Sequence, residues 1–138
     1  MVKTEYIELS TNGYTDIRDI TGELEALVQK GGIKNGIVTV FVPGSTGGLT
    51  TIEYEPGLVR DIPEILEKIA PIDGAYHHHN TWHDDNGSSH VRAALIGPSL
   101  TIPFSGKKLT LGTWQQVVFL DFDTRARSRR LVVQIMGE

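Results

Sequence analysis

The stretch Gly36–Val42 (GIVTVFV) decides the fold class of this 138-residue chain. Its residues are β-branched or apolar at almost every position, which predicts a central strand that is covered on both faces. Pro43 and Gly44 end this strand, and Leu49–Tyr54 follows as a second strand that we expect to be its hairpin partner. No stretch of the chain approaches the roughly 18 consecutive apolar residues that a membrane-spanning helix needs.

Further elements follow on both sides of this stretch. Strands are predicted over Val2–Leu9, Leu100–Phe104, Lys108–Leu111, Trp114–Phe122 and Arg130–Met136. Short turns separate the last four strands, so we expect them to be antiparallel neighbours. Helical spacing of apolar residues predicts a helix over Thr21–Lys30 and another that begins near Ile62, with Asp61 as its N-cap, because Pro63 interrupts the earlier pattern. A further helical stretch is expected over Ser89–Ile96.

Runs of strands without regular alternation with helices predict the α+β class. We expect a single domain over residues 1–138, with a mostly antiparallel, β-sandwich-like sheet and two or three helices. The composition, 39% hydrophobic and 22% charged, is ordinary for a soluble globular protein. The absence of cysteine excludes disulfides and zinc–thiolate sites, and together with the polar first residues it favours a cytoplasmic location.

The net charge of −4 hides an asymmetry between the two parts of the chain. Residues 1–87 carry a charge of −8 and residues 88–138 a charge of +4. Only four arginines cluster, namely Arg125, Arg127, Arg129 and Arg130, and no aromatic residues lie between them. We therefore expect no nucleic-acid partner. We interpret these arginines as the solvent face of a strand, and the alternative is that one or two reach an anionic ligand or a neighbouring subunit.

All five histidines lie in one segment, between His77 and His90, in the sequence YHHHNTWHDDNGSSH. Imidazole is the commonest nitrogen ligand of transition metals, and its pKa near neutrality also suits proton transfer. Asp84, Asp85 and Asn86 add oxygen donors that either complete a site or orient the imidazoles. The segment predicts a metal site or an acid–base site, and the alternative is a solvated histidine-rich loop.

The local structure of this segment decides which histidines meet. In a strand, His77 and His79 share one face and His78 points away. In a helix, His79 and His83 come together because they are four residues apart. The glycine, aspartate and asparagine content favours a loop over a helix. A helix that starts after the Gly-Ser-Ser turn would bring His90 back toward His79.

Two other motifs carry chemistry. The small residues of Gly44–Gly48 (GSTGG) allow a close backbone approach, and their hydroxyls and amides could hold an anion, although a hairpin turn is the simpler interpretation. Glu53 follows one strand later, and the spacing leaves open whether it reaches the same end of the sheet. Trp114 beside Gln115 offers a flat stacking surface next to an amide, and the alternative is a core or subunit-interface tryptophan.

Four blocks of sequence together carry a family resemblance. They are His79-Asn80 with Trp82, Asp85-Asn86-Gly87 and His90; Gly97–Pro103 (GPSLTIP); Leu111–Gln115 (LGTWQ); and Arg129-Arg130 before the last strand. In this order they resemble the YjbQ-like family, which is also labelled secondary thiamine-phosphate synthase. The likeness extends in weaker form over nearly the whole chain. Many members carry His-Thr-Ser where this chain has Gly44-Ser45-Thr46, so the role of that loop histidine does not transfer.

The resemblance implies a wrapped sheet with helices on one side, assembled as a homotrimer. It implies a divalent metal ion held by His79 and His90 near a subunit boundary, and we add His83 as a further candidate ligand. Imidazole ligands favour zinc or a similar transition metal over magnesium. The family label implies a weak thiamine-phosphate synthase activity, which joins a pyrimidine methyl pyrophosphate to a thiazole phosphate and releases pyrophosphate.

We therefore expect a metal-binding enzyme that acts on a small phosphorylated or anionic molecule, without a membrane partner. The candidate catalytic carboxylates are Glu53 and Asp85. The candidate substrate-binding residues are Ser45, Thr46, Asn86, Arg92, Thr113, Trp114 and Gln115. The alternative is a non-catalytic trimer that binds a metal or a small anion, which needs the same pocket but no base poised beside the ligand.

Overall fold

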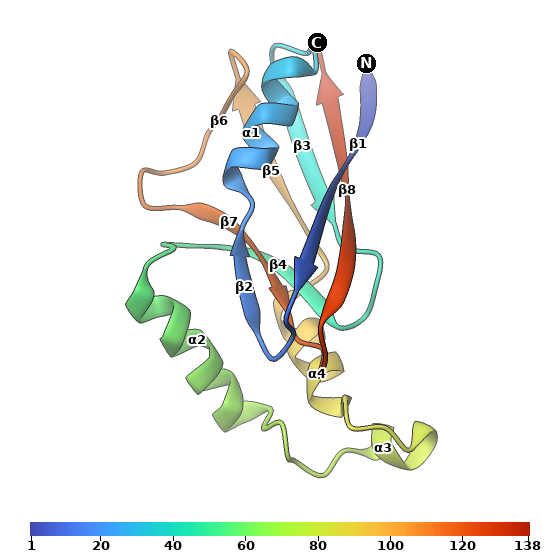
Figure 1. Cartoon of the computed structure of the whole chain (residues 1–138). Coiled ribbons are helices and arrows are strands. Elements are labelled where there is room, and N and C mark those ends of the chain that lie inside the picture. The colour runs from blue at the N-terminus through green and yellow to red at the C-terminus, as the bar shows by residue number, and fades with distance from the viewer.

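Eight strands and four helices make up the computed structural model, which describes residues 1–138 and confirms the α+β class (Figure 1). The strands are β1 (Val2–Thr11), β2 (Asp16–Asp19), β3 (Gly36–Phe41), β4 (Gly47–Ile52), β5 (Ser99–Ser105), β6 (Lys108–Leu109), β7 (Gln116–Asp121) and β8 (Arg127–Gly137). The helices are α1 (Thr21–Lys30), α2 (Pro56–Ile69), α3 (His77–Trp82) and α4 (Gly87–Ile96). None of these helices is long and apolar enough to cross a membrane.

The larger sheet has the order β1-β8-β3-β5-β6, and all its neighbouring strands are antiparallel. The predicted central strand is β3, which pairs with β5 on one side and β8 on the other. Its inward residues Val38 and Val40 are buried, whereas Ile37 and Phe41 on the outer face are 40% and 42% exposed. Within a single chain, the expectation that both faces of β3 are covered is therefore wrong.

The smaller sheet has the order β2-β7-β4, so the expected hairpin between β3 and β4 is wrong. After β3 the chain crosses from the larger sheet to the smaller one. The crossing is held where Val42 N donates to Pro98 O at 2.9 Å and Leu49 N donates to Gly97 O at 3.0 Å. Of the four C-terminal strands, only β5 and β6 pair as consecutive neighbours, because β7 and β8 lie in different sheets.

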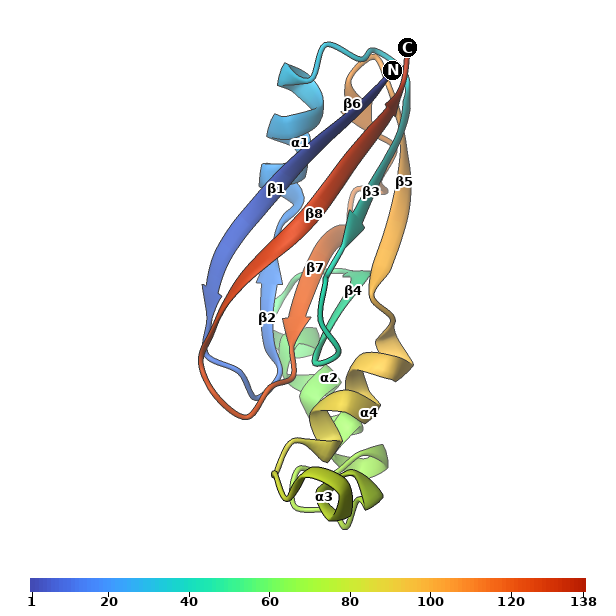
Figure 2. The same ribbon diagram turned by 90° about the vertical axis from the view of Figure 1, so that its right-hand side faces the viewer.

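Two apolar clusters explain why β7 needs its own sheet. The larger one lies between the two sheets and includes Val117 and Phe119 of β7 together with Leu24 and Val28 of α1. The smaller cluster, on the opposite face of β7, is closed by residues of α2 and α4. All residues of Val117–Leu120 are therefore buried. The result is a layered arrangement of larger sheet, smaller sheet and helices (Figure 2).

The helices differ from the sequence expectation at their starts. Helix α2 begins at Pro56 instead of near Ile62, because the Glu55 carboxylate caps it by accepting from the backbone N–H groups of Gly57 and Leu58. Pro63 lies inside α2 without ending it. Helix α1 has the predicted bounds, α4 starts two residues early, and α3 is a helix that the composition of its segment did not favour.

Candidate functional site

The histidine segment folds into two short helices that meet at an angle. Residues 83–86 connect α3 to α4, and His83 adopts a left-handed conformation (φ 56°) that reverses the chain. This reversal places His78 of α3 against His90 of α4, with the ring centroids 4.4 Å apart and the rings tilted by 41°. Both helices lie at the end of the molecule opposite to the chain termini (Figure 2).

A carboxylate and an amide adjoin this histidine pair. Asp84 Oδ1 lies 3.2 Å from His78 Nε2. The Asn86 amide, with its nitrogen turned toward them, donates to Asp84 Oδ1 at 2.8 Å and to His78 Nε2 at 3.1 Å. The imidazole rings of His78 and His90 and the carboxylate of Asp84 therefore lie close together.

The charge state of His90 follows from its surroundings. Burial lowers the pKa of His90 below its usual value, and the neighbouring His78 lowers it further. Asp84 and Asp123 oppose this shift without reversing it. The imidazole of His90 is therefore neutral at pH 7 and offers a lone pair, which is the form that binds a metal ion or accepts a proton.

A cavity of about 270 Å³ opens beside His90. Helix α4 forms one wall with His90, Ala93 and Ala94, and the loop between β3 and β4 forms the other with Gly44, Ser45 and Gly47. The neighbouring Gly48 permits β4 to pack closely against α4, because a Cβ atom there would lie 2.8 Å from Cγ2 of Ile96. The predicted anion loop and one predicted histidine thus share a cavity.

The other histidines lie differently from the expectation. His79, which the resemblance pairs with His90, instead places Nδ1 against the backbone carbonyl of Asp84 and has its ring edge-on to His83, with centroids 6.1 Å apart. His79 and Asp84 also line a second hollow of about 270 Å³ together with Tyr76. The structure brings His78 to His90, and it brings His79 to His83.

The donor set at His78, His90 and Asp84 matches what zinc or a similar ion prefers. No three histidine or carboxylate side chains in the structure converge on one point as a complete set of metal ligands. His78, His90 and Asp84 are therefore neighbours in this arrangement without forming a complete metal site.

The predicted arginine of the site has a structural role. Arg92 is buried, and each of its three guanidinium nitrogens donates a hydrogen bond, to Ala70 O, Thr15 Oγ1 and Glu67 Oε2. It joins α4 to the end of α2 and to the loop before β2. Asp85, a predicted catalytic carboxylate, accepts a hydrogen bond from Thr124 Oγ1 at 3.1 Å.

The remaining predicted residues lie at the opposite end of β4. Gly47, the first residue of that strand, faces the cavity, whereas Glu53 follows its last residue. A six-residue strand is roughly 20 Å long, so Glu53 does not reach His90 in the same chain. Gln115 lies near Glu53, since its Nε2 donates to Thr51 Oγ1. Thr113 precedes Trp114, whose side chain is 73% exposed, in the same loop.

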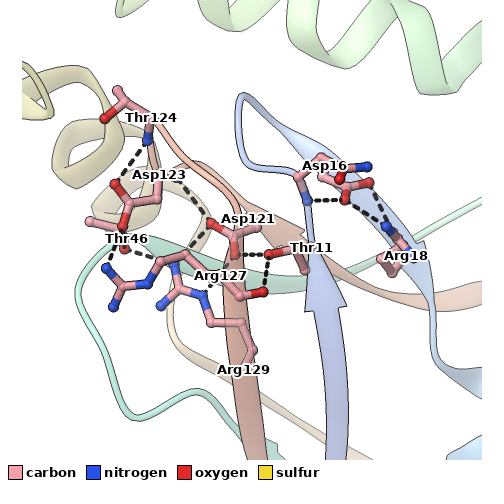
Figure 3. A network of polar contacts seen from close by, with 10 residues as sticks. Thr11, Asp16, Arg18, Thr46, Asp121, Asp123, Thr124, Arg127 and Arg129 are labelled. Atoms are coloured by element: carbon pink, nitrogen blue, oxygen red, sulfur yellow. Dashed lines mark hydrogen bonds and ion pairs between the residues drawn. The ribbon is translucent and has the colours of Figure 1, made fainter.

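A second polar cluster lies behind the β3–β4 loop, and it corrects the interpretation of the arginines (Figure 3). Arg129 is buried instead of solvated, because it shares the inward face of β8 with Leu131. Its Nε and Nη2 donate to the two carboxylate oxygens of Asp121 at 2.7 and 2.8 Å, and Nη2 also donates to Thr46 Oγ1 at 2.8 Å. Burial alone would raise the pKa of Asp121, but hydrogen bonds from Arg129 and Thr11 hold it below its usual value.

The sequence reasoning placed His78 outside the site and gave Arg129 no structural role. A signal for His78 exists, since the segment from His77 to His83 contains no glycine or proline and permits a helix. For Arg129 the only signal is the period-two pattern of β8, which places its side chain on the same face as Leu131 and Val133.

Comparisons with known proteins agree with the fold. Over 137 residues the chain is 36% identical to a UPF0047 protein of Methanothermobacter thermautotrophicus, and the match covers 99% of this chain and 94% of the relative. It is 38% identical over 130 residues to a UPF0047 protein of Archaeoglobus fulgidus, covering 94% and 98% of the two chains. The crystal structure of a hypothetical protein from Aeropyrum pernix superposes with a TM-score of 0.91 at 32% identity, covering 99% of each chain.

A further solved structure is that of a YbjQ-like protein of unknown function from Sulfolobus solfataricus. It superposes with a TM-score of 0.89 at 31% identity, and the match covers 100% of each chain. The family model described as "UPF0047 protein YjbQ-like" matches residues 5–138. The chain belongs to the YjbQ-like (UPF0047) family.

Proposed function

We propose that this protein is a metal-binding enzyme that acts on a small phosphorylated or similarly anionic molecule in the cavity between α4 and the β3–β4 loop. The observation that carries the proposal is the contact between the rings of His78 and His90, whose centroids lie 4.4 Å apart, together with the cavity that His90 and Ser45 both line. Imidazole nitrogens, a carboxylate and a hydroxyl near one another are the groups that metal-assisted chemistry on an anion uses.

His78, His90 and Asp84 are the residues that would hold the metal ion in this proposal, in place of the His79 and His83 of the sequence expectation. A bound zinc or similar ion would polarise a substrate oxygen or activate a water molecule. The lowered pKa of His90 supports the proposal because it keeps the imidazole free of a proton at neutral pH. Asn86 orients Asp84 by donating to its carboxylate, and its hydrogen bond to His78 Nε2 is exchanged for the metal ion when that ion binds.

The substrate class follows from the other wall of the cavity. The Ser45 hydroxyl and the glycine backbone beside it suit an anionic oxygen. Thiamine-phosphate synthase activity is the most specific form of this proposal. That reaction releases pyrophosphate, and stabilising the departing pyrophosphate needs several cationic groups. Arg92 is committed to internal hydrogen bonds, and this favours a substrate with one phosphate or carboxylate over a pyrophosphate.

The test compares histidine variants of protein purified without an affinity tag. After equilibration with zinc and dialysis, elemental analysis should find metal in the wild type and in His77→Ala. The double variant with His78→Ala and His90→Ala should bind none. Retention of zinc by the double variant contradicts the site. Metal binding without turnover of any phosphate ester or thiamine precursor favours the non-catalytic binding module instead.

Self-association as a homotrimer is part of the same proposal. The outer face of the larger sheet carries exposed apolar side chains in neighbouring positions, where Ile37 lies opposite Met136 and Phe41 lies opposite Val132. Exposed apolar side chains that adjoin on a sheet mark an interaction surface. Phe41→Lys should reduce the mass measured by light scattering to that of a monomer. Ile65→Lys, at an exposed apolar position on α2, should leave the mass unchanged.

A further inference from the structure

The residues on both sides of Ser45 are in contact with the same buried arginine. On one side, Thr46 Oγ1 accepts a hydrogen bond from Arg129 Nη2 at 2.8 Å. On the other side, a Cβ atom added to Gly44 would lie 3.3 Å from Arg129 Nη1, so this nitrogen lies directly against Gly44. Arg129 therefore contacts both neighbours of Ser45, a residue that lines the same cavity as His90.

The arginine itself is held rigidly. Its side chain is 6% exposed and the carboxylate of Asp121 that pairs with it is fully buried. Two parallel hydrogen bonds fix the plane of the guanidinium group. The Thr46 hydroxyl that accepts from it also donates to Asp123 Oδ2 at 3.5 Å, and Phe122 N donates to Thr46 O at 2.9 Å. The loop is therefore tied to β7 and β8 immediately next to Ser45.

We propose that Arg129 is a positioning residue, which acts through Thr46 and Gly44 to hold Ser45 toward His90 for binding of an anion. The proposal rests on the proposed function, because it concerns the same cavity. It assigns the Arg129–Asp121 pair a role beyond stability, because the arginine contacts the residues on both sides of Ser45.

Two buried threonines provide a matched comparison. Thr46 and Thr11 both hydrogen-bond to the Arg129–Asp121 pair, Thr46 through Arg129 Nη2 and Thr11 by donating to Asp121 Oδ2 (Figure 3). Only Thr46 adjoins Ser45. Valine has nearly the shape of threonine, so Thr46→Val and Thr11→Val each remove one hydroxyl and leave the two Arg129–Asp121 hydrogen bonds in place.

The experiment measures two properties in the wild type and in the Thr46→Val, Thr11→Val and Thr46→Ser variants. The first is the backbone order parameter of Ser45 from ¹⁵N relaxation, and the second is the dissociation constant of inorganic phosphate from the shift of the His90 imidazole signals. Thr46→Val should lower the order parameter from about 0.85 toward about 0.6 and weaken phosphate binding about tenfold. Thr11→Val should change binding less than about twofold, and Thr46→Ser should restore both properties.

Equal effects of Thr46→Val and Thr11→Val on phosphate binding and on Ser45 order overturn the proposal, because Arg129 then only stabilises the fold. If the wild type binds no phosphate, the proposed function fails, and the Ser45 order parameter alone decides the inference. Loss of order confined to Thr46→Val then supports the positioning role, and unchanged order refutes it.

Discussion

Two polar clusters lie on either side of the β3–β4 loop, and they differ in how completely their groups are paired within the chain. In the cluster of Arg129, Asp121 and Thr46, every carboxylate oxygen of Asp121 has a donor and the groups are buried. In the cluster of His78 and His90, both residues are partly exposed and His90 borders a cavity. The first cluster is closed, whereas the second is open to the cavity at His90.

The difference indicates which cluster performs chemistry. Both oxygens of the buried Asp121 carboxylate accept hydrogen bonds inside the protein, so this carboxylate has no free position for a ligand. His90, which borders a cavity, retains the capacity to bind one. The position of the loop between them suggests that the closed cluster supplies rigidity to the open one.

Removing one partner of the closed pair should have the largest effect on stability. Asp121→Ala leaves the Arg129 charge buried without its carboxylate, and the free energy of unfolding should fall by about 3–5 kcal/mol. Urea denaturation followed by circular dichroism measures the loss. The control is Asp84→Ala in the open cluster, where the partly exposed carboxylate should contribute no more than about 1 kcal/mol. Similar losses in the two variants would remove the distinction between the clusters.

Adding an imidazole to the open cluster should increase its affinity for zinc. Gly44 lines the same cavity as His90 and has no positive φ angle, so Gly44→His fits the backbone if Arg129 Nη1 shifts by a few tenths of an ångström. A third nitrogen ligand should tighten zinc binding by about tenfold or more, as measured by competition with a chelator. Gly22→His, which adds an imidazole to open space on α1, should leave zinc affinity unchanged.

As the pH falls, the open cluster should lose its zinc binding and its contribution to stability before the closed cluster loses its contribution to stability. The folded-state pKa of His90 is lowered, so its contributions to zinc binding and to stability are complete above its unfolded pKa of about 6.5 and are lost as pH falls through the lowered value. Zinc binding should therefore weaken below about pH 6. Asp121 also has a lowered pKa, and its contribution to stability is lost only below about pH 4.

Zinc titrations and urea denaturation over this pH range separate the two losses. His90→Ala should remove the change in stability between pH 7 and pH 5 and leave the loss below pH 4. A stability curve that is the same in His90→Ala and in the wild type would contradict the lowered pKa of His90.

The smallest effect is expected at His79. Its Nδ1 already contacts the Asp84 carbonyl, and its ring faces His83 instead of His90. His79→Ala should change zinc affinity by less than about twofold, whereas His78→Ala should abolish binding. Isothermal titration with zinc measures both. A loss of binding in His79→Ala alone would restore the pairing of His79 with His90 that the sequence resemblance implies.

The accuracy of the sequence predictions depended on how local each feature is. The bounds of α1 follow from apolar spacing and the glycines after Lys30, and they were predicted correctly. The pairing of β4 was predicted wrongly, because the choice between β3 and β7 depends on a crossing held by Pro98 O and Gly97 O, more than 40 residues away in the chain. Arg92 and Arg129 each also reach a threonine far away in the chain, Thr15 and Thr46, so charge alone did not reveal which arginine adjoins the anion loop.

The sequence by itself determined that this protein has the α+β fold of the YjbQ-like family and that its histidines are confined to His77–His90. These properties are set by composition, by short-range periodicity and by motif order, which are all local along the chain. Only the tertiary structure decided that His78 is the histidine that meets His90, and that Arg129 is the arginine behind Ser45. Both contacts require the chain to reverse or two sheets to pack, and the energy of such contacts depends on burial and distance in space, which residue spacing does not encode.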